Sequence, residues 1–476
     1  MFFRQLYDDG LAQASYIIGC DRTGEAVVVD PRRDIDVYEK VATAHSLRIA
    51  AVAETHIHAD YLSGGRELAA AASAPLFVSG HGDAEFGYLP VQEGVDVKLV
   101  RDGDRIHIGD VSARVRHTPG HTPEHICFEI FDGARATEPM LLLSGDFFFV
   151  GDLGRPDLLE EALGVSGAAR SSAHVMYASL TRALAELPDY VQLWPAHGAG
   201  SACGKALGAV PSTTLGYERR FSWWSGFARR SDEAGFVEAL LDGQPDVPSY
   251  FARMKHLNRG LTPILGRLPK PARLDVEQFS DAMRSGALLI DTRPRTAFCV
   301  AHAAGAVNVY DKPSFSLRSA WFASPDRQIV LLAPAGRVNA LVRSLVRVGL
   351  DRIAGYVEST EGLGQKTASL PSVTLDEVAR LRNSGEAVIV DVRQNSEYAH
   401  AHIPGSTHVS AGRLLAKLDD IPKDRPLVVV CAGGDRSVAV ASMLSALGFA
   451  PVANVPDGFD GWQARGLPVE SGLVRS

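Results

Sequence analysis

Hydrophobic residues in the first two hundred positions occur in short runs, a pattern typical of β-strands rather than of long helices. Gly, Pro and Asp residues, which favour turns, separate the runs EAVVVD, IAAVAE, PLFVS, HICFEIF, MLLLSGD and VQLWP. The pattern therefore predicts a sheet-rich segment up to about residue 210. Several of these runs end directly in His or Asp, so we expect polar side chains to collect at one rim of the sheets.

The pattern changes in the rest of the chain. Residues 217–258 have helix-like, aromatic-rich spacing, and LGRLPKPAR at 265–273 predicts a linker. Beyond the linker, segment 287–309 matches segment 387–409, with Asp, Arg, His and Gly residues repeated 100 positions apart. In each copy, near-continuous apolar strands alternate with helix-like segments. This tandem repeat predicts two small α/β domains with parallel sheets covered on both faces.

The composition indicates which class of protein this chain belongs to. A chain of 476 residues, 46% hydrophobic and 22% charged, is typical of a well-packed globular protein with about three domains. A net charge of −8 gives no basic surface for phosphate backbones, so we expect no nucleic acid partner. The longest apolar run, MLLLSGDFFFV, is too short to span a membrane, and no secretion signal is visible. We therefore expect a cytoplasmic protein without membrane association, whose five scattered cysteines are reduced.

Candidate metal ligands occur at the ends of the predicted strands. The stretch ETHIHADYLSGG contains His56, His58 and Asp60, and two alternating imidazoles at a strand end can face one cavity. Three later motifs, HTPGHT with His121, LLLSGD with Asp146 and LWPAHG with His197, add further imidazole and carboxylate groups. A pair of histidines alone is as often a packing feature, but the four motifs together predict a metal site.

These four motifs, in this order, resemble the metallo-β-lactamase superfamily over residues 1–255. The resemblance implies an αββα sandwich that holds metal at the rim between two sheets. Dinuclear members, such as glyoxalase II-like hydrolases, have the sequence HxHxDH, whose final Asp and His bind the second metal. Here Tyr61 replaces that His. Because tyrosine is a poorer ligand than imidazole for divalent metals, we expect the second metal site to be compromised.

The remaining set, His56, His121 and Asp146, matches the single-iron site of the persulfide dioxygenases in this superfamily. Two imidazoles and one carboxylate leave open positions on Fe(II), as oxygen chemistry requires. The resemblance implies one Fe(II) per chain, although the same ligands also bind zinc. It places the other polar groups in the vacated second site, where they would orient ligands or water: His58, Asp60, Tyr61 and His197.

Two further residues are candidates for substrate contact. Arg155 follows Asp146 closely, and the resemblance suggests that it lies near the thiol end of the substrate; a salt-bridged loop arginine is the alternative. Cys203, six residues after His197, could place a thiol at the pocket mouth, but a buried inert cysteine is the more common outcome. His125, four residues after His121, is equally consistent with packing and with a role at the site, and the remaining histidines of this region we assign to structure.

A candidate nucleophile lies in the second repeat. The strand LVVV leads directly into CAGGDRS, and a cysteine at such a strand-to-helix turn faces backbone N–H groups that favour the thiolate. With DVR, HIPG and GFDGW, this region resembles a rhodanese domain over residues 372–476. The Cys-x4-Arg spacing of Cys431 and Arg436 differs from the Cys-x5-Arg of phosphatases, and Arg436 could assist sulfur donors. In the first copy Ala333 aligns with Cys431, so that copy is expected to be silent.

The order of the domains along the chain resembles that of multidomain persulfide dioxygenase and sulfurtransferase fusions. We expect three domains: a metallo-β-lactamase-like dioxygenase domain at 1–265, a degenerate rhodanese domain at 274–366 and an active rhodanese domain at 372–476. The resemblance implies oxidation of a small thiol persulfide by O2 to sulfite, coupled through a Cys431 persulfide to thiosulfate formation. A zinc-dependent glyoxalase II-like thioester hydrolase and a non-enzymatic sulfur-relay scaffold are the alternatives. We also expect a homo-oligomer.

Overall fold

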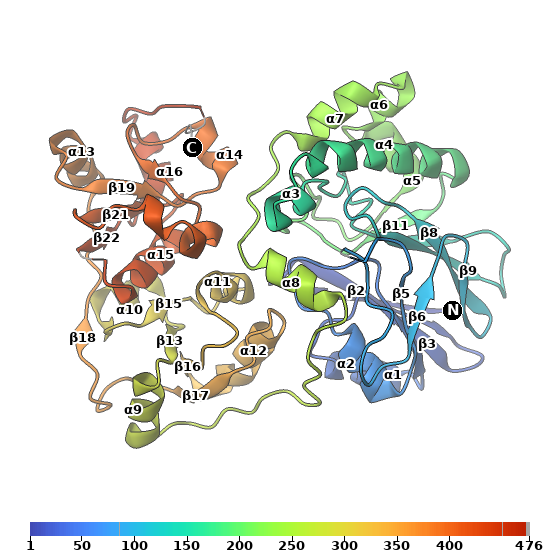
Figure 1. Cartoon of the computed structure of the whole chain (residues 1–476), viewed down its shortest axis with the longest axis horizontal. Helices are drawn as coiled ribbons and strands as arrows, with labels where there is room; N and C mark the ends of the chain where they lie inside the picture. The colour runs from blue at the N-terminus through green and yellow to red at the C-terminus, as the bar shows by residue number, and fades with distance from the viewer. Residues whose placement is uncertain (85, 450, 473–476) are drawn as a thin grey trace. The chain divides into compact units, whose positions relative to one another are not determined.

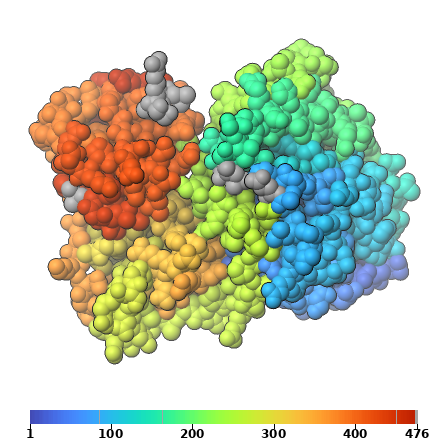
Figure 2. Space-filling view, in the orientation of Figure 1, coloured from blue at the N-terminus to red at the C-terminus, as the bar shows by residue number. Residues whose placement is uncertain are grey.

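The computed structural model describes residues 1–84, 86–449 and 451–472, and the residues outside this description are grey in Figure 2. The chain divides into two compact units, Met1–Leu268 and Pro269–Ser476. Each unit has its own sheets and its own buried apolar residues. Among the described residues, no helix is long and apolar enough to cross a membrane.

The first unit contains two six-stranded sheets. The first sheet runs in chain order: β1 (Phe2–Asp8), β2 (Gln13–Cys20), β3 (Glu25–Val29), β4 (Arg48–Ala53), β5 (Leu76–Ser79) and β6 (Val97–Val100). The second has the order β12 (Thr213–Thr214), β11 (Gln192–Pro195), β10 (Leu141–Gly145), β9 (Ile126–Asp132), β8 (Val111–His117) and β7 (Arg105–Ile108). Strands β3 to β6 are parallel, and so is the pair β10–β11.

The alternation of side chains along each strand produces the layers. In β2, Tyr16 and Ile18 pack with Phe128 and Ile130 of β9 between the two sheets, whereas Ile17 faces the opposite side. On that outer side lie helices α1 (Asp36–Ala44) and α2 (Gly65–Ala72). The outer face of the second sheet is covered by α4 (Ala168–Glu186), α5 (Leu215–Phe221), α6 (Ser225–Arg230) and α7 (Glu233–Leu241) (Figure 1). The expected αββα sandwich is confirmed.

The second unit contains two four-stranded parallel sheets of the same order. The first joins β15 (Val307–Asn308), β13 (Leu288–Asp291), β16 (Ile329–Leu332) and β17 (Ile353–Val357). The second joins β20 (Thr407–His408), β19 (Val388–Asp391), β21 (Leu427–Val430) and β22 (Val452–Asn454). Two short strands, β14 (His302–Ala303) and β18 (Thr367–Ala368), form an antiparallel pair. The predicted pair of α/β domains with parallel sheets is confirmed.

Helices accompany both parallel sheets (Figure 1). The first repeat has α9 (Val276–Arg284), α10 (Arg295–Val300), α11 (Phe315–Phe322) and α12 (Ala335–Val346). The second has α13 (Leu375–Ser384), α14 (Asn395–His400), the 3-10 helices η1 (Ala411–Ala416) and η2 (Leu418–Asp420), α15 (Asp435–Ala446) and α16 (Gly458–Ala464). In the second repeat, Val378 of α13 and Trp462 of α16 pack on Ile389 and Val428 of the sheet. The indole N–H of Trp462 donates to the Pro468 carbonyl oxygen.

Each repeat contains an Asp–Arg ion pair at the same position, which is buried in the second repeat and part-buried in the first. In the second repeat, Arg393 Nη2 lies 2.6 Å from Asp391 Oδ2 and 2.8 Å from the Ala401 carbonyl oxygen. In the first repeat, Arg293 makes the same bonds to Asp291 and Ala301. Both aspartates end the central strand of their sheet, so the pair fixes the loop that follows that strand.

We expect Asp391→Ala to destabilise the second repeat by about 3 kcal/mol or more, because it leaves the buried Arg393 without its carboxylate. Hydrogen exchange of peptides that cover β19 and β21 measures this loss of stability. Asp281→Ala, which removes an exposed pair with Arg284, is the control and should cost less than about 1 kcal/mol. Unchanged exchange in Asp391→Ala would show that the ion pair does not stabilise this domain.

Candidate metal centre and cysteine loop

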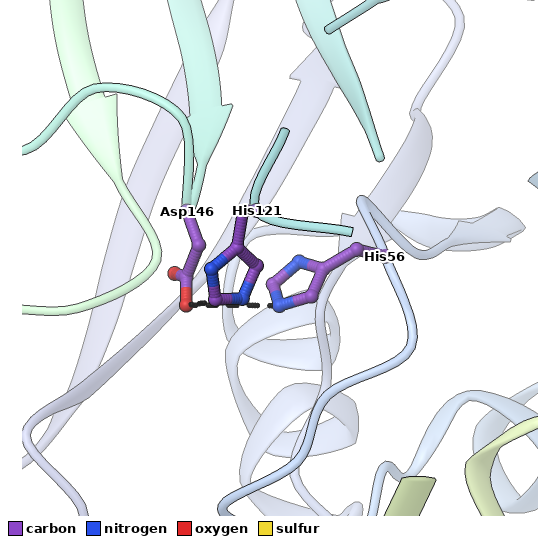
Figure 3. Close-up of side chains that lie close together, drawn as sticks. All are labelled: His56, His121 and Asp146. Atoms are coloured by element: carbon purple, nitrogen blue, oxygen red, sulfur yellow. Dashed lines mark ion pairs between the residues drawn. The ribbon is translucent and has the colours of Figure 1, made fainter. Parts of the chain in front are cut away.

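Three strand ends of the first unit bring the predicted ligands together. His56 follows β4, His121 lies in the loop between β8 and β9, and Asp146 follows β10. Their candidate ligand atoms all lie within 4.8 Å of one another, and all three side chains are buried. Asp146 Oδ2 lies 3.7 Å from His56 Nε2 and 3.4 Å from His121 Nε2. Figure 3 shows the three side chains pointing toward one another.

Hydrogen bonds fix which nitrogen of each imidazole faces the centre. His121 Nδ1 lies 2.9 Å from the Arg155 carbonyl oxygen, an acceptor, so Nδ1 carries the proton. His56 Nδ1 lies 3.0 Å from Thr55 Oγ1, and that hydroxyl donates to Asp30, so it accepts from Nδ1. Both Nε2 atoms therefore keep a free lone pair. Such bonds to the second nitrogen orient metal-binding histidines.

The electrostatics of the cluster also fit a metal cation. Burial lowers the pKa of His56 and of His121 well below the usual value, and neighbouring histidines lower it further, so both imidazoles are neutral. Asp146 Oδ2 is buried and has no hydrogen-bond partner among the described residues. A buried carboxylate oxygen without a partner is costly unless it binds a cation. Two neutral imidazoles and this oxygen are a ligand set that suits Fe(II) or Zn²⁺.

The residues expected in the second site are bound to one another. His197 Nδ1 lies 2.7 Å from Asp146 Oδ1, and His197 Nε2 lies 2.9 Å from Asp60 Oδ2. Burial lowers the pKa of His197, but the carboxylates of Asp146 and Asp60 outweigh burial and raise it well above the usual value. His197 is thus a cation that donates from both nitrogens, and neither nitrogen has a lone pair for a metal.

His58 differs from the sequence-based expectation, because it does not join Asp60 and His197. Its Nε2 lies 3.2 Å from Asp30 Oδ1 and 3.5 Å from Glu54 Oε2, in a separate buried cluster. Burial lowers the pKa of His58, but the two carboxylates raise it to about 10. The side chain that follows His56 by two residues is therefore an imidazolium whose Nε2 faces these two carboxylates, although its ring centroid lies 4.1 Å from that of His56.

Tyr61 also faces this second cluster rather than Asp60. Its hydroxyl accepts from Gln13 Nε2 at 3.2 Å and is 3.3 Å from the Asp30 carbonyl oxygen, to which it donates. Burial raises the pKa of Tyr61 well above the usual value, so the phenol stays neutral. The replacement of the motif's last histidine by this tyrosine removes a metal-binding group and adds a hydrogen-bonded packing residue.

The two predicted substrate residues are both buried. Arg155 pairs with Asp157 through Nε at 2.7 Å and Nη2 at 2.6 Å, while its own carbonyl accepts from His121. Cys203 has its Sγ within 4.8 Å of the ligand atoms of Asp60 and His197, and burial raises the pKa of its thiol to about 12. Arg155 is placed to support His121, and contact of either residue with substrate stays a prediction.

Several residues that contact this region were not predicted from the sequence. His125 Nε2 accepts from the Asp146 backbone N–H at 2.9 Å, and burial lowers the pKa of His125 to about 3, which keeps it neutral. The side-chain amide of Asn258 donates to the carbonyl oxygens of His58 and Tyr61. Buried Lys255, like Asn258 on α8 (Phe251–Asn258), interacts electrostatically with Asp146. The spacing of His125 four residues after His121 was the one available signal.

A cavity of about 450 Å³ lies on the His197 side of the centre. Tyr7, Pro195, His197 and Val210 are among the residues that line it. Its volume is within the usual range for small-molecule sites, about 300–1,000 Å³.

The cysteine loop of the second unit has the geometry of an anion-binding turn. Cys431 follows β21, and its Sγ accepts from the Gly434 N–H at 3.1 Å and lies 3.3 Å from Ser437 Oγ. Helix α15 begins directly afterwards, so its N-terminus is next to the sulfur. Arg436 makes two bonds to Glu397, at 2.6 and 2.7 Å.

The strand register shows which residue of the first repeat corresponds to Cys431. Asp291 lies opposite Leu332 in the first repeat, and Asp391 lies opposite Val430 in the second, which places Ala333 at the position of Cys431.

Comparisons with known proteins agree with both units. Residues 8–197 match the Metallo-beta-lactamase superfamily, and residues 275–362 and 374–465 each match the Rhodanese-like domain. A metallo-beta-lactamase crystal structure from Staphylococcus aureus subsp. aureus COL is 39% identical, with a TM-score of 0.66, and the match covers 75% of this chain and 98% of that one. Hydroxyacylglutathione hydrolase of Methylococcus capsulatus is 30% identical over 56% of this chain and 91% of its own.

ETHE1 from Myxococcus xanthus, a third relative, is 25% identical, with a TM-score of 0.41, over 56% of this chain and all of its own. The two matched families indicate enzyme activity, and the first unit has a metal-binding fold with a His/Asp cluster. The chain belongs to the metallo-β-lactamase superfamily, as a member in which two rhodanese-like domains follow the metallo-β-lactamase domain.

Proposed function

We propose that this protein is an iron-dependent persulfide dioxygenase with an attached sulfurtransferase. The observation that carries the proposal is the difference between the two halves of the metal centre. His56, His121 and Asp146 offer three free donor atoms, whereas His197 is bound through both nitrogens to carboxylates. One open-faced metal suits a reaction with O2, and a two-metal hydrolase would need His197 as a ligand.

The substrate would be a low-molecular-weight thiol persulfide. The balanced reaction is RSSH + O2 + H2O → RSH + sulfite + 2 H⁺, in which the outer sulfur is oxidised and O2 is reduced. Fe(II), when bound, supplies the redox chemistry of this reaction. His121 and His56 would hold it through Nε2, and the His197 imidazolium would hold Asp146 so that Oδ2 faces the metal.

The rhodanese-like domain would carry sulfane sulfur on Cys431. In the transfer step the sulfur of sulfite attacks the outer sulfur of the Cys431 persulfide. A new S–S bond forms in thiosulfate, the bond to Sγ breaks, and its electron pair returns to Sγ as thiolate. The Gly434 N–H and the N-terminus of α15 stabilise that thiolate. The shared chain would raise the local concentration of sulfite near Cys431.

A second candidate is a thioester hydrolase, because a hydroxyacylglutathione hydrolase is 30% identical to this chain. That activity would require two metals, and Asp60 would have to exchange its bond to His197 for a metal bond. Metal content and substrate range separate the two candidates.

We expect the protein, purified and loaded anaerobically, to bind about one iron per chain and to consume O2 with thiol persulfides. His121→Ala should abolish O2 consumption and lower metal content, because it removes one of three protein ligands. Elemental analysis and an oxygen electrode measure the two quantities. His174→Ala, which changes an exposed histidine paired with Glu233, is the control and should behave as wild type. Two tightly bound zinc ions with glutathione thioester hydrolysis would contradict the dioxygenase proposal.

We expect Cys431→Ser to keep persulfide-dependent O2 uptake but to change the product from thiosulfate to free sulfite. The variant lacks the sulfur carrier, and the metal centre does not include Cys431. Mass spectrometry should show a persulfide on Cys431 in the wild type, and ion chromatography should identify the products. Cys299→Ser in the silent repeat is the matched control. Thiosulfate at wild-type yield from Cys431→Ser, after subtraction of non-enzymatic formation, would show that the two activities are not coupled.

A further inference from the structure

The first rhodanese repeat, which has Ala333 in place of a nucleophile, contacts the cysteine loop of the second. Arg295 of α10 donates through Nη1 to the Gly433 carbonyl oxygen, two residues from Cys431. Its Nε lies 3.4 Å from Asp435 Oδ1, and Lys312 Nζ lies 2.6 Å from Asp435 Oδ2. The silent repeat therefore anchors both the middle and the end of this loop.

The helices of the two repeats also pack together around the loop. Helix α10 contacts α15, and η1 contacts both α11 and α15. The Asn308 N–H of the first repeat donates to Ser442 Oγ of α15 at 2.9 Å, and both residues are buried. These contacts pack α10 and β15 of the silent repeat against α15, the helix whose N-terminus faces Cys431, and they pack α11 against η1.

The arginine within the cysteine loop is not available for an anion. Both ends of the Arg436 guanidinium bind the Glu397 carboxylate of the same domain, at 2.6 and 2.7 Å. Such a bidentate pair neutralises the cation and fixes its direction. A doubly negative sulfur oxyanion that approaches the loop needs another positive group.

Arg318 of α11 is that group. Its side chain is half-buried, and in the described part of the chain its guanidinium makes neither a hydrogen bond nor an ion pair. It interacts electrostatically with both Asp435 and Cys431. Burial lowers the pKa of Arg318, yet arginine remains charged at neutral pH. A half-buried cation with free N–H donors, in the repeat that binds the cysteine loop through Arg295 and Lys312, is suited to hold an oxyanion.

The net charge around the cysteine loop also favours the binding of an anion. Arg295, Lys312, Arg318 and Arg436 face the carboxylates of Asp435 and Glu397, which leaves two positive charges in excess. A persulfide on Cys431 would neutralise only one of them. The site would therefore still attract an anionic partner, and the silent repeat contributes three of the four cations.

We propose that Arg318 of the silent repeat binds the sulfur oxyanion, sulfite or thiosulfate, that exchanges sulfur with Cys431. This inference rests on the proposed sulfur transfer at Cys431 and gives the first repeat a function in it. The guanidinium would bind the oxygen atoms of sulfite while the sulfite sulfur faces the persulfide. In transfer, the sulfite–sulfur bond forms as the bond to Cys431 Sγ breaks, and the electron pair remains on Sγ.

The test uses the full-length protein with Cys431 loaded as the persulfide, and two acceptors. Sulfite carries the charge that Arg318 would bind, whereas dithiothreitol is a neutral thiol. We expect Arg318→Gln to lower kcat/KM for sulfite by about 10- to 100-fold, the usual effect of losing a hydrogen bond to a charged group. Transfer to dithiothreitol and the amount of Cys431 persulfide should stay at the wild-type level. Arg318→Lys should recover part of the sulfite activity.

Arg284→Gln is the matched control, because Arg284 is an exposed arginine of the same repeat that pairs with Asp281. It should leave both acceptors unaffected. Equal rates for Arg318→Gln and wild type with sulfite would overturn the inference, and so would an equal loss with both acceptors. If wild type loads sulfur and transfers it to dithiothreitol but not to sulfite, the oxyanion role is overturned while Cys431 remains a sulfur carrier. If wild type loads no sulfur, the proposed sulfurtransferase activity fails as well.

Discussion

The metal centre depends on the carboxylate of Asp146, because its two oxygens face different groups. Oδ1 binds the His197 imidazolium at 2.7 Å, and Oδ2 faces His56 and His121 without a hydrogen-bond partner in the described chain. The backbone N–H of Asp146 is in turn held by His125. A carboxylate fixed from two directions can present one oxygen to a metal with little loss of freedom on binding. His197 therefore orients Asp146, and its second nitrogen is bound to Asp60.

Much of this centre could be predicted from the sequence, because the ligands lie in short motifs at strand ends. The apolar runs placed His56, Asp146 and His197 at one rim, and the αββα sandwich does bring them together. The sequence could not show which group each side chain binds. His58 and Tyr61 belong to the same motif as His56, yet both turn toward Asp30, which lies on a different strand end. His58 lies against the carboxylates of Asp30 and of Glu54, four residues before it, whereas Tyr61 donates to the backbone carbonyl of Asp30.

Arginines were the hardest residues to interpret from sequence. Arg155 and Arg436 each lie within a functional motif, and each is neutralised by a carboxylate, Asp157 or Glu397. Arg318 belongs to no motif and lies in the repeat without a nucleophile, yet its guanidinium has no ion pair within the described residues. Proximity in sequence identifies a candidate, but the availability of an arginine depends on whether a carboxylate is already bound to it. Only the three-dimensional arrangement gives that information.

The duplication gives a physical reason why a silent repeat can remain useful. Both copies keep the Asp–Arg pair at the end of the central strand, so the fold does not depend on the cysteine. Loss of the nucleophile at Ala333 removes chemistry from the first loop, but it leaves α10 and α11 free to specialise toward the second. The bond from Arg295 to the Gly433 carbonyl restrains a loop rich in glycine, which would otherwise lose much conformational entropy when it orders around sulfur. The first repeat can thus act as part of the active site of its neighbour.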